Sequence, residues 1–122
     1  MSATIYNSDR YFTIFDFSIS HSQLLLRSSK NENQNTNIDV IFFDVKFQQL
    51  STYLMGLEIS IKNNQKTSMA KKDNFFILKS NNEEYHVVAS FVKVYENHLN
   101  FGETSLGVLQ NKGREVEIAS ST

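Results

Sequence analysis

The chain has 122 residues, of which 40% are hydrophobic and 12% aromatic, and its formal charge at pH 7 is −1. These values are typical of one globular domain, and the balanced charge gives no reason to expect nucleic acid or an anionic membrane surface as a partner. Because there is no Cys, disulfides, thiolate catalysis and Cys-ligated zinc are excluded. No stretch resembles a signal peptide or contains 18 consecutive apolar residues, so we expect a soluble, cytoplasmic protein.

Two strands are expected at the start of the chain. Residues 1–9 contain a short apolar run that predicts either an edge strand or a loose terminus, whereas the alternation over residues 11–19 predicts a strand. If residues 21–22 form a tight two-residue loop, the next strand pairs with this one so that Asp16 faces Arg27. A shift of one residue would remove that charge pair, so the two-residue loop is the more consistent interpretation.

The middle of the chain alternates between polar connections and strands. Residues 29–37 and 63–73 are polar and predict two exposed, mobile connections. Residues 38–47 predict a strand with apolar side chains on both faces, and residues 57–62 predict a half-buried strand. Between these strands Ser51 is placed to cap a single helical turn, so a short helix is expected at a sheet corner.

Residues 74–96 predict a β-hairpin whose loop is Asn81 and Asn82. Runs rich in Phe, Ile, Val and Tyr flank these residues, and Asn tolerates the positive φ angles of tight two-residue turns. The loop fixes the register. It places opposite one another Ser80 and Glu83, Lys79 and Glu84, Leu78 and Tyr85, Ile77 and His86, and Phe76 and Val87.

The second arm of this hairpin is predicted to be the longest strand of the protein. From residue 85 it is largely apolar on both faces, which is typical of a strand in the middle of a sheet. Residues 97–98 predict a second tight turn into residues 99–104, which would complete a three-stranded meander. Residues 114–118 predict an edge strand within a tail, residues 110–122, whose end we expect to be loose.

Together these elements predict an all-β protein. Six to eight strands, short turns and two longer connections favour an antiparallel β-sandwich or a partly open barrel, with at most one short helix. We expect the whole chain, residues 1–122, to form one such domain.

Most catalytic and cofactor sites are disfavoured. The three histidines lack the spacing that presents two metal ligands from one element, so no metal site is expected. With only four Gly there is no glycine-rich phosphate loop or dinucleotide fingerprint, so no cofactor is expected. Four acidic residues on expected strands are interpreted as solvated or ion-paired side chains rather than a catalytic pair: Asp16, Asp39, Asp44 and Glu58. We assign no catalytic residue.

Arg27 is the strongest candidate for a polar site. Its planar guanidinium can hold a carboxylate or a phosphate. As a structural residue it would instead form an intramolecular salt bridge with Asp16, and we favour this interpretation. If Arg27 binds a ligand, Asp16, His86 and Tyr85 are the residues expected beside it.

Two functional hypotheses follow. The first is a non-catalytic binding or assembly module that associates with itself or with another protein, because several strands are apolar on both faces and need a second sheet or a second subunit to cover them. The alternative is a small-molecule site, catalytic or purely binding, in the mouth of a barrel around Arg27 and His86. Neither hypothesis includes a nucleic acid or a membrane as partner.

Overall fold

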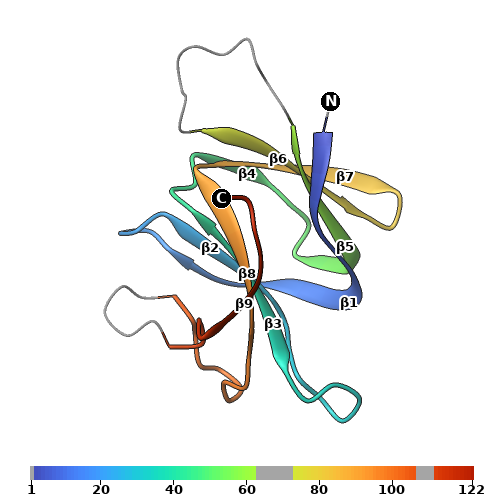
Figure 1. Ribbon diagram of the computed structural model, residues 1–122, viewed down its shortest axis with the longest axis vertical. Helices are drawn as coiled ribbons and strands as arrows, with labels where there is room; N and C mark the ends of the chain where they lie inside the picture. Colours follow the sequence, from blue (N-terminus) through green and yellow to red (C-terminus); the bar gives the residue numbers. More distant parts are fainter. Residues whose placement is uncertain (1, 63–72, 107–111) are drawn as a thin grey trace.

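The computed structural model describes residues 2–62, 73–106 and 112–122. These residues form nine strands and no helix, and the strands make one antiparallel sheet (Figure 1). The strands are β1 (Ser2–Ser18), β2 (Gln23–Ser28), β3 (Asn37–Phe43), β4 (Phe47–Gln49), β5 (Tyr53–Lys62), β6 (Asn74–Ser80), β7 (Glu83–Ala89), β8 (Phe91–Asn97) and β9 (Val116–Ser120). The predicted all-β antiparallel fold is confirmed, with nine strands instead of six to eight. The described residues include no helix that could cross a membrane.

The order of strands across the sheet is β4-β7-β6-β5-β1-β2-β3-β8-β9. The long strand β1 is strongly bent (Figure 1), and it pairs with β5 from Ser2 to Thr13 and with β2 from Thr13 to Ser18. Residues 2–9, expected as either an edge strand or a loose terminus, therefore belong to β1, the longest of the strands in the described residues.

The sheet surrounds one main core. Its end strands, β4 and β9, do not pair with each other, so it is not closed into a barrel. Buried side chains from β1, β2, β3 and β5 to β8 nevertheless pack in a single cluster. In this cluster Phe42 of β3 and Phe76 of β6 lie edge to face, with 5.5 Å between ring centroids. Since β3 and β6 are not neighbours in the sheet, this contact requires the sheet to curl around the core.

The β6–β7 hairpin has the predicted register. Asn81 and Asn82 form its loop, and both have positive φ angles, 51° and 68°. The ladder runs without interruption from the pair of Ser80 with Glu83 to that of Asn74 with Ala89. Because the loop residues suit a two-residue turn, local chemistry was sufficient to predict this pairing.

The long strands predicted at residues 38–47 and from residue 85 onward are each divided in two. Asp44, whose φ is 58°, lies between β3 and β4, and Ser90 lies between β7 and β8. The two breaks adjoin: the Ser90 N–H donates to the Phe43 carbonyl at 2.9 Å, and the Ser90 hydroxyl donates to Asp44 Oδ2 at 2.8 Å. The prediction of one longest strand in the middle of the sheet is therefore wrong.

The break at Ser90 allows apolar side chains of both β7 and β8 to face the same core. Val87 and Ala89 point into the core before the break, and Val92 and Val94 do so after it. Odd-numbered residues thus face the core in β7 and even-numbered residues in β8. A continuous strand cannot make this change, because its side chains alternate with a period of two.

Two other local expectations are wrong. The helical turn expected at Ser51 is absent, and Gly56, with a φ of 80°, lies inside β5 opposite an irregularity in β1. Residues 99–104 do not return as a strand beside β8. That place is taken by β9, the edge strand predicted in the tail.

The predicted polar connections have different outcomes. Residues 29–36 join β2 to β3 as expected, whereas residues 63–72 lie outside the described residues.

The first hairpin has a different register from the predicted one. Its loop comprises four residues, 19–22, instead of two, and a bulge near Phe15 shifts the pairing again. As a result Arg27 faces Thr13, and the predicted pairing of Arg27 with Asp16 is wrong. In a bulge, two residues of one strand lie opposite a single residue of the partner strand. The alternation of apolar and polar residues in a sequence does not reveal where a bulge occurs.

A second, smaller apolar cluster lies on the outer face of β2, β3 and β8. Its buried members are Leu25, Ile41 and Tyr95, and Leu106 packs against them. We use the term strap for residues 98–106 together with residues 112–115. The strap covers the apolar face that was expected to need a second sheet or a second subunit.

Candidate functional site

Arg27 lies beneath the strap and is paired with Asp39 of β3. Arg27 Nε donates to Asp39 Oδ1 at 2.6 Å, and Nη2 donates to Oδ2 at 2.8 Å, a two-pronged arrangement. The two side chains are 2% and 0% exposed. The β2–β3 ladder brings them together, since the two residues are directly opposite. Arg27 does form an intramolecular salt bridge, but its partner is Asp39 rather than Asp16.

This pair is also bonded to the strap and to Asn97 at the end of β8. Asp39 Oδ2 accepts hydrogen bonds from the Ser105 hydroxyl at 2.7 Å and the Asn97 amide at 3.0 Å. Arg27 Nη1 donates to the Glu103 carbonyl at 2.6 Å. In the described part of the chain no buried side-chain nitrogen or oxygen lacks a partner. The pair is therefore closed within the protein and holds the strap on the sheet.

Buried asparagines extend this network to the other end of the strap. The Asn97 amide also donates to the Gly113 carbonyl at 3.0 Å, and Asn97 Oδ1 accepts from the Asn37 amide at 2.8 Å. Gly113 has a φ of 86°, and a Cβ there would lie 2.7 Å from Leu99 Cδ1. Glycine is therefore required at this position.

The four residues expected to form a ligand site do not gather around one cavity. Arg27 is enclosed under the strap, and Asp16 accepts a hydrogen bond from the Thr104 hydroxyl at 2.7 Å. His86 and Tyr85 belong to β7, and Tyr85 packs against the main core. The groove described next is lined by none of the four.

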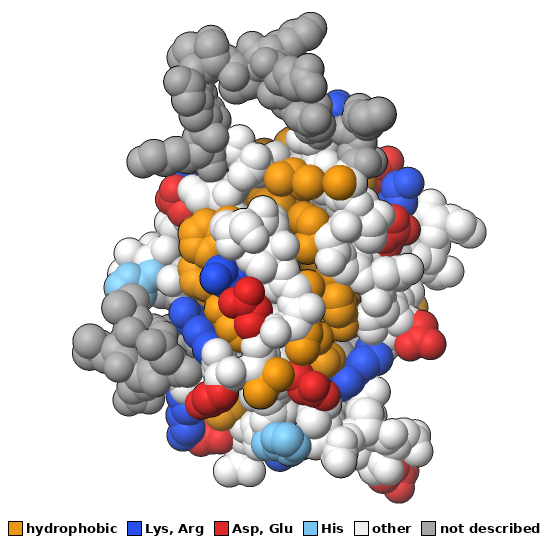
Figure 2. Space-filling view, in the orientation of Figure 1, with side chains coloured by type: hydrophobic (Ala, Val, Ile, Leu, Met, Phe, Trp, Pro, Cys, Tyr) orange, Lys and Arg blue, Asp and Glu red, His pale blue; other side chains and the backbone are white. Residues whose placement is uncertain are grey.

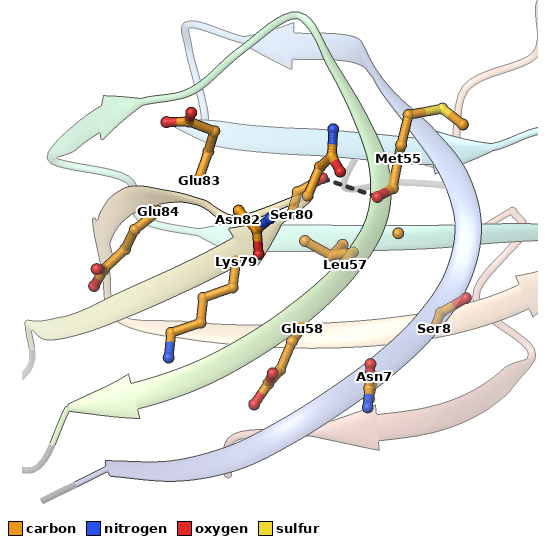
Figure 3. Close-up of a pocket in the computed structure, with 12 residues that line it drawn as sticks. Asn7, Ser8, Met55, Leu57, Glu58, Lys79, Ser80, Asn82, Glu83 and Glu84 are labelled. Carbon is orange, nitrogen blue, oxygen red and sulfur yellow. Dashed lines mark hydrogen bonds between the residues drawn. The ribbon is translucent and has the colours of Figure 1, made fainter.

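A groove of about 530 Å³ lies where the β6–β7 turn approaches β1 and β5 (Figure 3). This volume is within the range of about 300–1,000 Å³ that is usual for ligand sites. The residues that line the groove are Asn7, Ser8, Met55, Gly56, Leu57, Glu58 and residues 79–84. The β1 ladder is irregular beside it, between Ser8 and Tyr11, opposite Gly56. The groove therefore depends on a departure from regular pairing that the sequence does not show.

The groove is acidic. Its lining carries three carboxylates, Glu58, Glu83 and Glu84, and one ammonium, Lys79, a net charge of −2. Glu58 and Lys79 are opposite one another in the β5–β6 ladder. In Figure 3 Glu83 and Glu84 stand at the hairpin end and Met55 at the other side. A cationic group would be attracted to the hairpin end.

An exposed apolar surface continues from the groove at Met55. Tyr11 and Tyr53 stack with 6.1 Å between ring centroids, and Tyr11 is directly opposite Met55 in the β1–β5 ladder. The three side chains are 49%, 54% and 56% exposed, in the order Tyr11, Tyr53, Met55. We use the term tyrosine surface for these three residues. In the sequence, Tyr53 and Met55 alternate with Leu54, which is buried. This alternation was the signal that could have indicated the exposed face, and sequence reasoning missed it.

Apolar side chains also reach solvent elsewhere. Figure 2 shows hydrophobic side chains at the surface between charged ones on the face that carries β9. Ile19 in the first loop is 83% exposed, and Phe101 in the strap is 95% exposed. Single exposed residues are normal, so only a grouped or specially held side chain indicates binding.

The carboxylate of Glu103 fixes the beginning of the strap. Its Oε2 accepts from Lys112 Nζ at 2.9 Å, and its Oε1 accepts from the Asn100 N–H at 2.8 Å. These contacts lower the pKa of Glu103 below its ordinary value of 4.5. The hydrogen bond from Lys112 is the main cause, and the hydrogen bond from the Asn100 N–H is the next. Ionised Glu103 therefore favours the folded state.

We expect Glu103→Gln to be less stable than the unchanged protein at neutral pH, and the difference to shrink in acid. The folded-state pKa is lowered, so the contribution is complete above the unfolded pKa and is lost as the pH falls through the folded-state value. Urea unfolding of both proteins between about pH 7 and about pH 3 measures this. A difference that stays constant across this range would show that the ionisation of Glu103 does not stabilise the fold.

The described residues contain no group of three or more His, Asp or Glu side chains placed to hold a metal ion. The tyrosine surface and the acidic groove adjoin at Met55, which belongs to both. No protein-family model, curated protein or solved structure matches the chain.

Proposed function

We propose that this protein is a non-catalytic binding module that holds a segment of polypeptide on the tyrosine surface, with the polar part of that segment in the adjoining groove. The proposal rests on one observation: Tyr11, Tyr53 and Met55 point away from the core. The alternating residues Phe12 and Leu54 already supply the core on these two strands. Tyrosine and methionine that the fold does not require are typical of binding surfaces.

The charge of the groove indicates the chemistry of the partner. A net charge of −2 beside an apolar surface complements a segment that carries Lys or Arg next to an apolar side chain. Arginine and lysine also interact favourably with the faces of exposed tyrosine rings. We propose that the module acts in the cytoplasm, which is compatible with its lack of Cys.

The alternative hypothesis, a small-molecule site around Arg27 and His86, has less support. The guanidinium of Arg27 donates to Asp39 and Glu103 and is 2% exposed, so a ligand would have to displace these contacts. The groove needs no such displacement.

Selection of a random displayed peptide library on the purified chain tests the proposal. We expect the selected peptides to combine Lys or Arg with an apolar residue. Their affinity for the Tyr53→Ser and Glu84→Gln variants should be about tenfold lower than for the unchanged protein, which corresponds to about 1.4 kcal/mol. Ile19→Ser and Glu32→Gln are matched controls, because they change an exposed apolar and an exposed acidic residue outside the surface and groove.

Two results would contradict this function. One is a selection that yields acidic peptides, or none. The other is a set of peptides whose affinity falls equally for the control variants and for the groove variants.

A further inference from the structure

Phe101 stands at the tip of a tight turn. The Glu103 N–H donates to the Asn100 carbonyl at 3.0 Å, which closes the turn, and Gly102 has a φ of 91°. The Phe101 side chain is 95% exposed. A turn of this kind with glycine in its third position leaves the second residue pointing outward.

The turn is bonded to the rest of the protein at Glu103. Arg27 donates from beneath to the Glu103 carbonyl, and the carboxylate of Glu103 bonds Asn100 and Lys112. An aromatic side chain on a fixed turn loses little further freedom when it binds, so it contributes more affinity than one on a flexible loop. The guanidinium of Arg27 thus bonds both Asp39 and the turn that carries Phe101.

Two lysine side chains are bonded to the strap that carries Phe101. Lys112 bonds Glu103 within the turn, and Lys30 Nζ donates to the His98 carbonyl at 2.9 Å, at the start of the strap. Lys30 and Lys112 thus place two ammonium groups at the strap, beside the carboxylate of Glu103. The turn therefore presents an apolar residue next to cations, the chemistry that complements the tyrosine surface and its acidic groove.

We infer that the Phe101 turn of one molecule docks on the tyrosine surface of a second copy of the chain, with its lysines toward the acidic groove. This inference rests on the proposed function and names its partner. Phe101 packs against Met55 and the stacked tyrosines, and Lys30 or Lys112 approaches Glu83 and Glu84. The two surfaces are different patches of one molecule, so the contact is head to tail and builds a ring or a filament.

Sedimentation velocity of the full chain over a range of concentrations tests this. We expect the mass to rise with concentration, and self-association to weaken by about tenfold to a hundredfold in Phe101→Ser, because one buried Phe is lost. Met55→Ser combined with Glu84→Lys should weaken it similarly from the other side. Ile19→Ser is the matched control and should leave self-association unchanged. Higher salt should weaken it, since the contact joins opposite charges.

Mixing the two defective proteins gives the sharpest result. Phe101→Ser keeps an intact tyrosine surface and Met55→Ser/Glu84→Lys keeps an intact turn, so an equimolar mixture should form a 1:1 complex at a concentration at which neither protein associates alone. A mixture that stays monomeric, a wild-type chain that is monomeric up to about 1 mM, or undiminished association of Phe101→Ser would each overturn the inference. If the wild-type chain is monomeric but binds peptides, the inference is wrong and the proposed function stands. If the chain neither self-associates nor binds peptides, both the inference and the proposed function are wrong.

Discussion

Replacing Arg27 with Met is expected to lower the free energy of unfolding by about 3–5 kcal/mol. The reason is that the carboxylate of Asp39, which is 0% exposed, would be left buried without the guanidinium that donates two hydrogen bonds to it. Ser105 and Asn97 would still donate to Asp39, but neither carries a charge. Denaturant unfolding at neutral pH measures the change.

Two companion variants separate the buried pair from other effects. Asp16→Asn should change stability by less than about 1 kcal/mol, because Asp16 is only partly buried and bonds Thr104 rather than Arg27. The double variant Arg27→Met with Asp39→Leu should recover part of the loss, since it removes both charges from the interior. Equal effects of Arg27→Met and Asp16→Asn would show that Asp39 is not the partner of Arg27.

The parts of the fold that could be predicted are those that neighbouring residues decide. The β6–β7 register follows from Asn81 and Asn82, which suit positive φ angles. The edge strand β9 was also visible in its own alternation. In both cases a short stretch of sequence contains the whole signal.

The parts that could not be predicted depend on residues far apart in the chain. The corner at Asp44 and Ser90 joins positions 46 residues apart, and each stretch by itself looks like one long strand. Similarly, the partner of Arg27 is on the next strand, where Asp39 interrupts an otherwise apolar run. An acidic residue between Ile38 and Val40 was the one available hint that a buried cation faces this strand.

The candidate site was missed for a related reason. Tyr11, Tyr53 and Met55 are apolar, so a sequence pattern assigns them to a core as readily as to a surface. Only the pairing of β1 with β5 shows that all three lie on the outer face. The strap has no regular structure over residues 98–106, although residues 99–104 were predicted to return as a strand, so the exposed position of Phe101 was not predicted either.

Replacing Phe42 with Ala should lower the free energy of unfolding by about 3–5 kcal/mol, and replacing Phe76 with Ala should have a similar effect. Both side chains are fully buried, and their rings touch across the core from strands that are not neighbours in the sheet. Phe101→Ala is the matched control. Its side chain is 95% exposed and should contribute almost nothing to stability.

The double variant of Phe42 and Phe76 tests the curvature of the sheet directly. If the rings are in contact, the two losses should fail to add by about 0.5–1.5 kcal/mol, the usual coupling of an edge-to-face aromatic pair. The cycle is read from the unfolding midpoints and slopes of four proteins in denaturant. Strictly additive losses would mean that β3 and β6 do not meet. The sheet would then be flatter than a contact between these two rings requires. Non-additivity would instead show that β3 and β6, which are separated in the sheet by β5, β1 and β2, meet across one core.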